Sequence, residues 1–74
     1  MRKLIKGWEG PTEHKVCLLR GSTLEAKREG GPNDTENGHL IVYGAYVDGE
    51  RVSQHHSHLA AQYAAEDVAL GLRA

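Results

Sequence analysis

The chain has 74 residues, of which 39% are hydrophobic and 26% are charged, and its formal net charge is -1. Such a chain forms one small domain, residues 1–74, and is too short for a two-domain enzyme. Its longest uncharged apolar run, residues 40–47, falls far short of the roughly 20 residues that a membrane-spanning helix needs. Because residues 1–6 lack the apolar run of a signal peptide and a single cysteine cannot form an internal disulfide, we expect a cytoplasmic protein.

Charge divides the chain into two parts of opposite sign. Residues 1–28 carry seven Lys and Arg against three Glu, a net charge of +4. Residues 29–74 carry two Arg against seven Asp and Glu, a net charge of -5. Charges separated in this way can orient a protein in the field of a partner, unless folding interleaves the two parts.

The first predicted elements are a strand and a hairpin. Leu4, Ile5 and Trp8 favour a strand over residues 2–8. Residues 14–20 and 23–28 form the first predicted hairpin, because Gly21-Ser22 between two short apolar runs suits a type II′ turn. Cys17 lies in the first strand of this hairpin, where apolar neighbours favour burial rather than catalysis.

Asp48-Gly49 marks the second hairpin, between residues 39–47 and 50–53, since both turn residues tolerate a positive φ. Residues 39–47 are mostly apolar, which predicts the central and most covered strand of an antiparallel sheet. Between the hairpins, residues 29–38 contain three Gly and no large apolar side chain. We expect a flexible loop over 29–38, because that segment has nothing to bury.

Residues 57–72 predict one helix, with Ser57 as its N-cap. Every fourth residue is small or apolar and forms the predicted buried stripe, which consists of Ala60, Ala64, Val68 and Leu72, flanked by Leu59, Tyr63 and Leu70. The side expected to face solvent carries His58, Gln62, Glu66 and Arg73. The predicted fold class is therefore α+β: a small antiparallel sheet of three to five strands, built from two hairpins and covered by one C-terminal helix.

No pattern of catalytic or metal-binding residues emerges. Three of the five histidines stand in His55-His56-x-His58, but adjacent residues of a strand point to opposite faces and do not easily share one zinc ion. The sequence contains neither a Gly-x-Ser-x-Gly elbow nor a glycine-rich phosphate loop. We therefore expect no enzymatic activity, no metal site and no cofactor.

The segment of residues 57–70, following the second hairpin, resembles the C-terminal helix of double-stranded-RNA-binding domains. The resemblance implies small Ala residues that pack the helix on a sheet, and lysines in its first turn that clamp RNA phosphates. The lysine positions hold His58, Leu59 and Gln62 in this chain. Residues 2–8 favour a strand where that family has a helix, and Glu66 and Asp67 would repel phosphate, so we do not assign the chain to the family.

We expect a non-enzymatic, protein-binding regulator that occupies a surface of a larger macromolecular machine. Small phage-encoded inhibitors of host RNA polymerase or of bacterial defence complexes share this size and simplicity. The expected contacts with an acidic partner surface lie in the basic part of the chain, at Arg2, Lys3, Lys6, Trp8, Lys15 and Arg20. The alternative is a nucleic-acid-binding module that uses the same basic part, although a net charge of -1 disfavours it.

Overall fold

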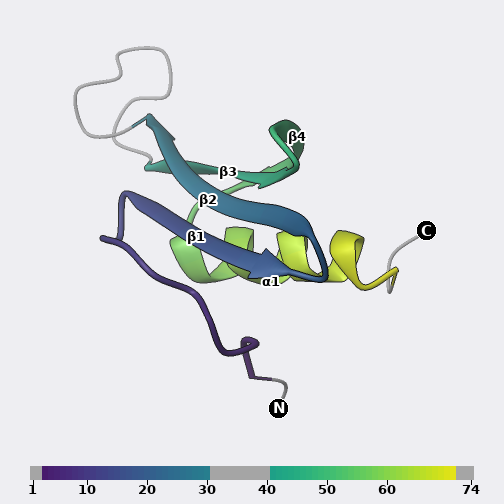
Figure 1. Ribbon diagram of the computed structural model, residues 1–74. Helices are drawn as coiled ribbons and strands as arrows, with labels where there is room; N and C mark the ends of the chain where they lie inside the picture. The colour runs from purple at the N-terminus through teal and green to yellow at the C-terminus, as the bar shows by residue number, and fades with distance from the viewer. Residues whose placement is uncertain (1–2, 31–40, 72–74) are drawn as a thin grey trace.

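The computed structural model describes residues 3–30 and 41–71 (Figure 1). Its elements are β1 (His14–Leu19), β2 (Ser22–Gly30), β3 (Val42–Val47), β4 (Glu50–His55) and α1 (His58–Ala69). The strands form one antiparallel sheet in the order β1-β2-β3-β4, and α1 packs across one face of it. This arrangement confirms the predicted α+β fold. The predicted flexible loop lies outside the described residues, apart from its first two positions, which end β2.

Both hairpins close with two-residue turns in which each residue has a positive φ, which defines a type I′ turn. The φ values are 52° at Arg20 and 84° at Gly21, and 53° at Asp48 and 85° at Gly49. The second hairpin therefore follows the sequence prediction. The type II′ turn predicted at Gly21-Ser22 is wrong, because Ser22 pairs with Leu19 and the turn lies one residue earlier.

The strand predicted over residues 2–8 does not form in the part that the structure describes. Glu9 makes one isolated bridge to Val16 of β1, and residues 3–8 before it have no strand partner. Gly7 and Gly10 have φ values of 115° and 101°, so the backbone turns instead of extending. Figure 1 shows this N-terminal segment, residues 3–9, running from beyond the sheet toward the start of β1.

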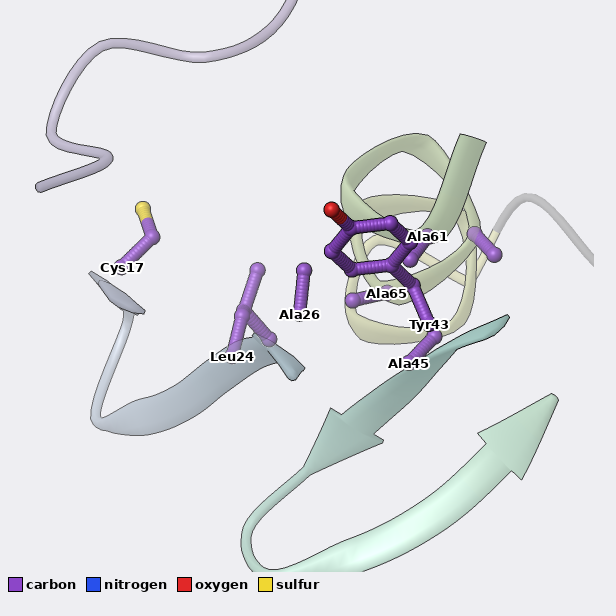
Figure 2. Packing of buried hydrophobic residues seen from close by; sticks show 8 residues of the cluster. Cys17, Leu24, Ala26, Tyr43, Ala45, Ala61 and Ala65 are labelled. Atoms are coloured by element: carbon purple, nitrogen blue, oxygen red, sulfur yellow. The ribbon is translucent and has the colours of Figure 1, made fainter. Parts of the chain in front are cut away.

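The core lies between the sheet and α1 and is built mainly from small side chains. It consists of Cys17, Leu24, Ala26, Tyr43, Ala45, Ala61, Ala64 and Ala65, most of which are labelled in Figure 2. The small alanine side chains of the core leave room for α1 to pack directly on the sheet. The side-chain oxygen of Ser57 accepts a hydrogen bond from the Ala60 amide at 3.1 Å, which confirms the predicted N-cap. No helix in the described ranges is long and apolar enough to cross a membrane.

The buried side of α1 differs from the predicted stripe. Gln62 and Glu66 are 2% and 1% exposed, although both were expected to face solvent, whereas Leu59 is 48% exposed. The prediction assumed that the sheet alone covers the helix. The N-terminal segment instead packs against the flank of α1 that carries Glu66, and so a second surface is buried.

Chain order and sheet order are the same, so β1 and β2 form one half of the sheet and β3 and β4 the other. The strands of the basic part of the sequence therefore lie together, and those of the acidic part lie beside them. The order of the strands keeps the two parts of the chain side by side in the sheet, but α1 brings Glu66 of the acidic part against the N-terminal segment of the basic part, so folding partly interleaves the two.

Candidate functional site

The described histidines are dispersed, and each contacts a different neighbour. The pairs are His14 with Glu25 at 2.7 Å, His55 with Ser53 at 2.8 Å, His56 with the Ile41 carbonyl at 3.4 Å, and His58 with Gln62 at 2.9 Å. The fifth histidine, His39, lies outside the described residues. Among residues 3–30 and 41–71, no three His, Cys, Asp or Glu side chains are grouped so that they could hold a metal ion.

Cys17 is buried, which confirms the interpretation of this residue as part of the core. Burial raises the pKa of the Cys17 thiol, and the negative charge of Glu66 raises it further. A thiol with a raised pKa is protonated at neutral pH and is a poor nucleophile. Cys17 therefore belongs to the packing of the protein.

A buried carboxylate joins the N-terminal segment to the helix. Glu66 accepts hydrogen bonds from the backbone N–H of Ile5 at 2.8 Å and from the indole N–H of Trp8 at 2.7 Å. Trp8 is half-buried and packs against the core, so its ring serves at least to anchor this segment. Sequence reasoning missed Glu66, and the available signal was Trp8 itself, because a buried indole N–H usually finds an acceptor.

The face of the sheet opposite α1, the helix-free face, carries a cluster of polar side chains around Glu29. Tyr46 donates a hydrogen bond from its hydroxyl to Glu29, and Arg51 and Gln54 each donate one at 3.0 Å. Glu29 stands at the register shift of β2, and its carboxylate lies flat on Gly44, where a Cβ would meet it at 2.5 Å. This glycine therefore makes room for the cluster.

These contacts also set the protonation of the carboxylate. Burial raises the pKa of Glu29, but the hydrogen bonds from Tyr46, Gln54 and Arg51 and the charge of Arg51 together hold the pKa below its ordinary value. The hydrogen bond that Tyr46 donates to Glu29 is the main cause that raises the pKa of the Tyr46 hydroxyl, and burial raises this pKa further. Lys27 lies 4.3 Å from the centre of the Tyr46 ring. The polar side chains of this cluster are thus bound to one another.

The predicted partner-binding residues lie around β1 and do not form one compact patch. Lys3 and Lys6 are exposed in the N-terminal segment, Lys15 is half-buried near the start of β1, and Arg20 is exposed in the turn beyond its end. At a rise of about 3.3 Å per residue, the backbones of Lys15 and Arg20 are about 16 Å apart. Arg2 lies outside the described residues.

Leu18 is the exposed apolar residue at the centre of this region. It lies in β1, is 75% exposed, and borders an open depression of about 430 Å³ lined by Gly7, Glu9, Val16 and Leu18. Sequence reasoning missed Leu18, because residues 16–19 are all apolar and no alternation marks their faces. The signal was the predicted burial of Cys17, since a neighbouring strand residue must then point to the opposite face.

No protein-family model matches the chain, and no curated protein or solved structure is significantly similar to it. The resemblance to double-stranded-RNA-binding domains also finds little support in the geometry. Gln62, at one of the positions where that family has phosphate-clamping lysines, is buried, and residues 3–9 form no helix.

Proposed function

We propose that the chain is a small, non-enzymatic regulator that binds another protein on the β1 side of its sheet. The observation that supports this proposal is the exposure of Leu18, which is 75% exposed beside an open depression. The polar side chains around Glu29 satisfy one another, whereas Leu18 presents apolar surface to water. Covering such a side chain with a partner is favourable because it removes apolar surface from water.

The charges around this site favour an acidic partner. Lys3, Lys6 and Arg20 are exposed on the elements that flank Leu18, so an approaching acidic surface is attracted before it makes contact. A domain of this size acts most readily by covering a surface of a larger assembly. More specifically, the proposed regulator is a cytoplasmic inhibitor that covers a surface of a machine such as an RNA polymerase or a defence complex.

Site-specific photo-crosslinking tests this function. p-Benzoylphenylalanine is introduced at Leu18 or, as the matched control, at Leu59, which is also apolar and exposed but lies on α1. Both variants are irradiated in nuclease-treated lysate of the native host, and the products are identified by mass spectrometry. We expect one protein to crosslink from position 18 but not from position 59, and excess wild-type chain to compete with the crosslink.

Charge reversal then tests the partner's chemistry with the captured protein in purified form. Lys3→Glu with Lys6→Glu should slow association while changing the free energy of unfolding by no more than about 0.5 kcal/mol, as is usual for exposed sites. Equal crosslinking from both positions would show that Leu18 has no special role. A lysate without nuclease treatment that yields mainly crosslinked RNA or DNA would favour the nucleic-acid-binding alternative.

A further inference from the structure

The backbone of β1 has an outward-facing side that is only partly paired. Val16 and Glu9 exchange two backbone hydrogen bonds across this side, each 2.9 Å long. In an antiparallel sheet, every second residue of an edge strand directs both its N–H and its C=O outwards, and Leu18 is the next such residue. No described residue forms a backbone hydrogen bond with Leu18 on this side, and its carbonyl has only a long contact, at 3.8 Å, from the Cys17 thiol.

The N-terminal segment pairs with β1 at Glu9 but diverges from it at the preceding residues, which would otherwise pair with Leu18. The register that joins Glu9 to Val16 would bring Gly7 opposite Leu18. Gly7 has a φ of 115°, which takes the backbone out of the extended conformation, and Glu66 holds the preceding residues on the α1 side. The open depression is lined by residues of both β1 and the N-terminal segment, so it lies where the two separate.

We propose that the partner enters this site as an extended segment that adds a strand to the β1 edge beside Leu18. This inference rests on the proposed function and names the partner's chemistry: apolar residues alternating with acidic ones. Alternate residues of a strand point to opposite faces, so the apolar residues accompany Leu18 on the helix-free face. The acidic residues then lie on the other face, which Lys15 shares, near the Arg20 turn.

A peptide segment fits this edge better than the other polymers that could bind it. Leu18 offers one backbone donor and one backbone acceptor, and another peptide backbone supplies the complementary pair, whereas a phosphate diester only accepts. A second copy of the chain would bring a second set of the same cations to this edge, where like charges repel. One carboxylate, that of Glu9, lines the depression. Lys3, Lys6, Lys15 and Arg20 do not line the depression but lie on the N-terminal segment, on β1 and in the adjoining turn, from which they attract an acidic segment at longer range.

An NMR titration with two synthetic probes tests the proposal. The probes are capped six-residue peptides in which Val alternates with Glu or, in the control, with Lys. A chemically ligated chain with an ester in place of the Leu18 amide removes the outward N–H. The ester also makes the Cys17 carbonyl a weaker acceptor toward β2, so the free energy of unfolding of this chain is measured beside its binding. Leu18→Ala is the matched variant that keeps the N–H and removes the side chain.

We expect the Glu peptide to shift the Leu18 amide resonance and to slow its hydrogen exchange. The ester should weaken this binding on the order of fivefold, as expected for one lost hydrogen bond, and the Lys peptide should bind more weakly than the Glu peptide. The proposal is overturned if the ester variant of the chain binds the Glu peptide as tightly as the wild type does, or if the Glu and Lys peptides bind equally well. It is also overturned if neither peptide binds at millimolar concentration, or if the free chain dimerises through β1. A crosslink from position 18 would in those cases still support protein binding through the Leu18 side chain. Peptide binding without such a crosslink would instead contradict the proposed function alone.

Discussion

The two edges of the sheet differ in how they meet solvent. On β4, Ser53 pairs with Ala45 and Arg51 pairs with Tyr46, so Val52 is an extra residue that forms a bulge. Exposed polar side chains follow along this edge, at Glu50, Arg51 and Gln54. Bulges and charges are the usual protection of an edge strand against unwanted pairing. On β1, neither feature is found at Leu18, and no described residue pairs with its outward backbone groups.

The structure beside β1 and the structure beside β4 are also stabilised by different contacts. The β1 side depends on the buried carboxylate of Glu66, which binds the N-terminal segment. The β4 side depends on the carboxylate of Glu29, which lies on the helix-free face among Tyr46, Arg51 and Gln54. Removal of a buried acceptor leaves its donors unsatisfied, whereas solvent can replace a more accessible one. The same type of side chain should therefore contribute differently to stability on the two sides.

The largest effect is expected for Glu66→Ala. The substitution removes the acceptor of the Ile5 amide and the Trp8 indole, and should lower the free energy of unfolding by about 3 kcal/mol. Urea denaturation followed by circular dichroism measures this loss. Glu66→Gln is the control, because its amide oxygen can still accept from the same donors and should cost less. A loss below about 1 kcal/mol for Glu66→Ala would mean that the N-terminal segment is held by other contacts.

A smaller effect is expected on the β4 side for Gly44→Ala. The new Cβ would meet the Glu29 carboxylate at 2.5 Å and displace it from its donors. We expect a destabilisation of about 1 to 2 kcal/mol, typical of an overpacked site. In a double-mutant cycle with Glu29→Ala, the cost of Gly44→Ala should largely disappear. Additive costs would show that the glycine is required for a reason unrelated to Glu29.

The Glu29 cluster should also make stability depend on pH. The pKa of Glu29 is lowered in the folded protein, so its ionised form stabilises the fold above the carboxyl's ordinary value of 4.5, and this contribution is lost as the pH falls through the folded pKa. Thermal melts of the wild type and Glu29→Gln, measured between about pH 7 and pH 3, should converge at the acidic end. A difference that grows as the pH falls would have the wrong sign.

The smallest effect is expected in the β1–β2 turn. Arg20 has a φ of 52°, a conformation that asparagine adopts more easily than arginine, and Asp48 occupies the matching position of the other turn. Arg20→Asn should raise the free energy of unfolding by about 0.5 kcal/mol, which calorimetry can detect as a higher Tm. It should also slow association with an acidic partner, because it removes a cation beside Leu18. Faster association would contradict the proposed partner chemistry.

Local patterns were sufficient to predict most elements of this fold. Asp48-Gly49 gave its hairpin because two residues that tolerate a positive φ stand between apolar runs, and Ser57 capped the helix because its side chain precedes the first turn. The wrong position predicted for the β1–β2 turn also comes from relying on a local pattern. A Gly-Ser pair indicates a turn, but only the pairing of Leu19 with Ser22 decides its register.

The candidate site was less accessible to prediction, because contacts between distant parts of the chain build it. Glu66 and Trp8 are separated by 58 residues, and no local pattern joins them. Local patterns alone therefore predicted a strand over residues 2–8 and a solvent-facing position for Glu66. The basic residues could be selected from their charge alone, but the exposure of Leu18 depends on where the N-terminal segment leaves β1.

Amide hydrogen exchange in the free protein tests most directly whether the β1 edge is open. Val16 and Leu18 are two residues apart on the same strand, with both backbone groups directed outwards, and only Val16 is paired with Glu9. We predict that the Val16 amide exchanges slowly, whereas the Leu18 amide exchanges at nearly the rate of an unprotected peptide. Equal protection of the two amides would show that the edge at Leu18 is already occupied, and would contradict the open edge on which the proposed mode of binding depends.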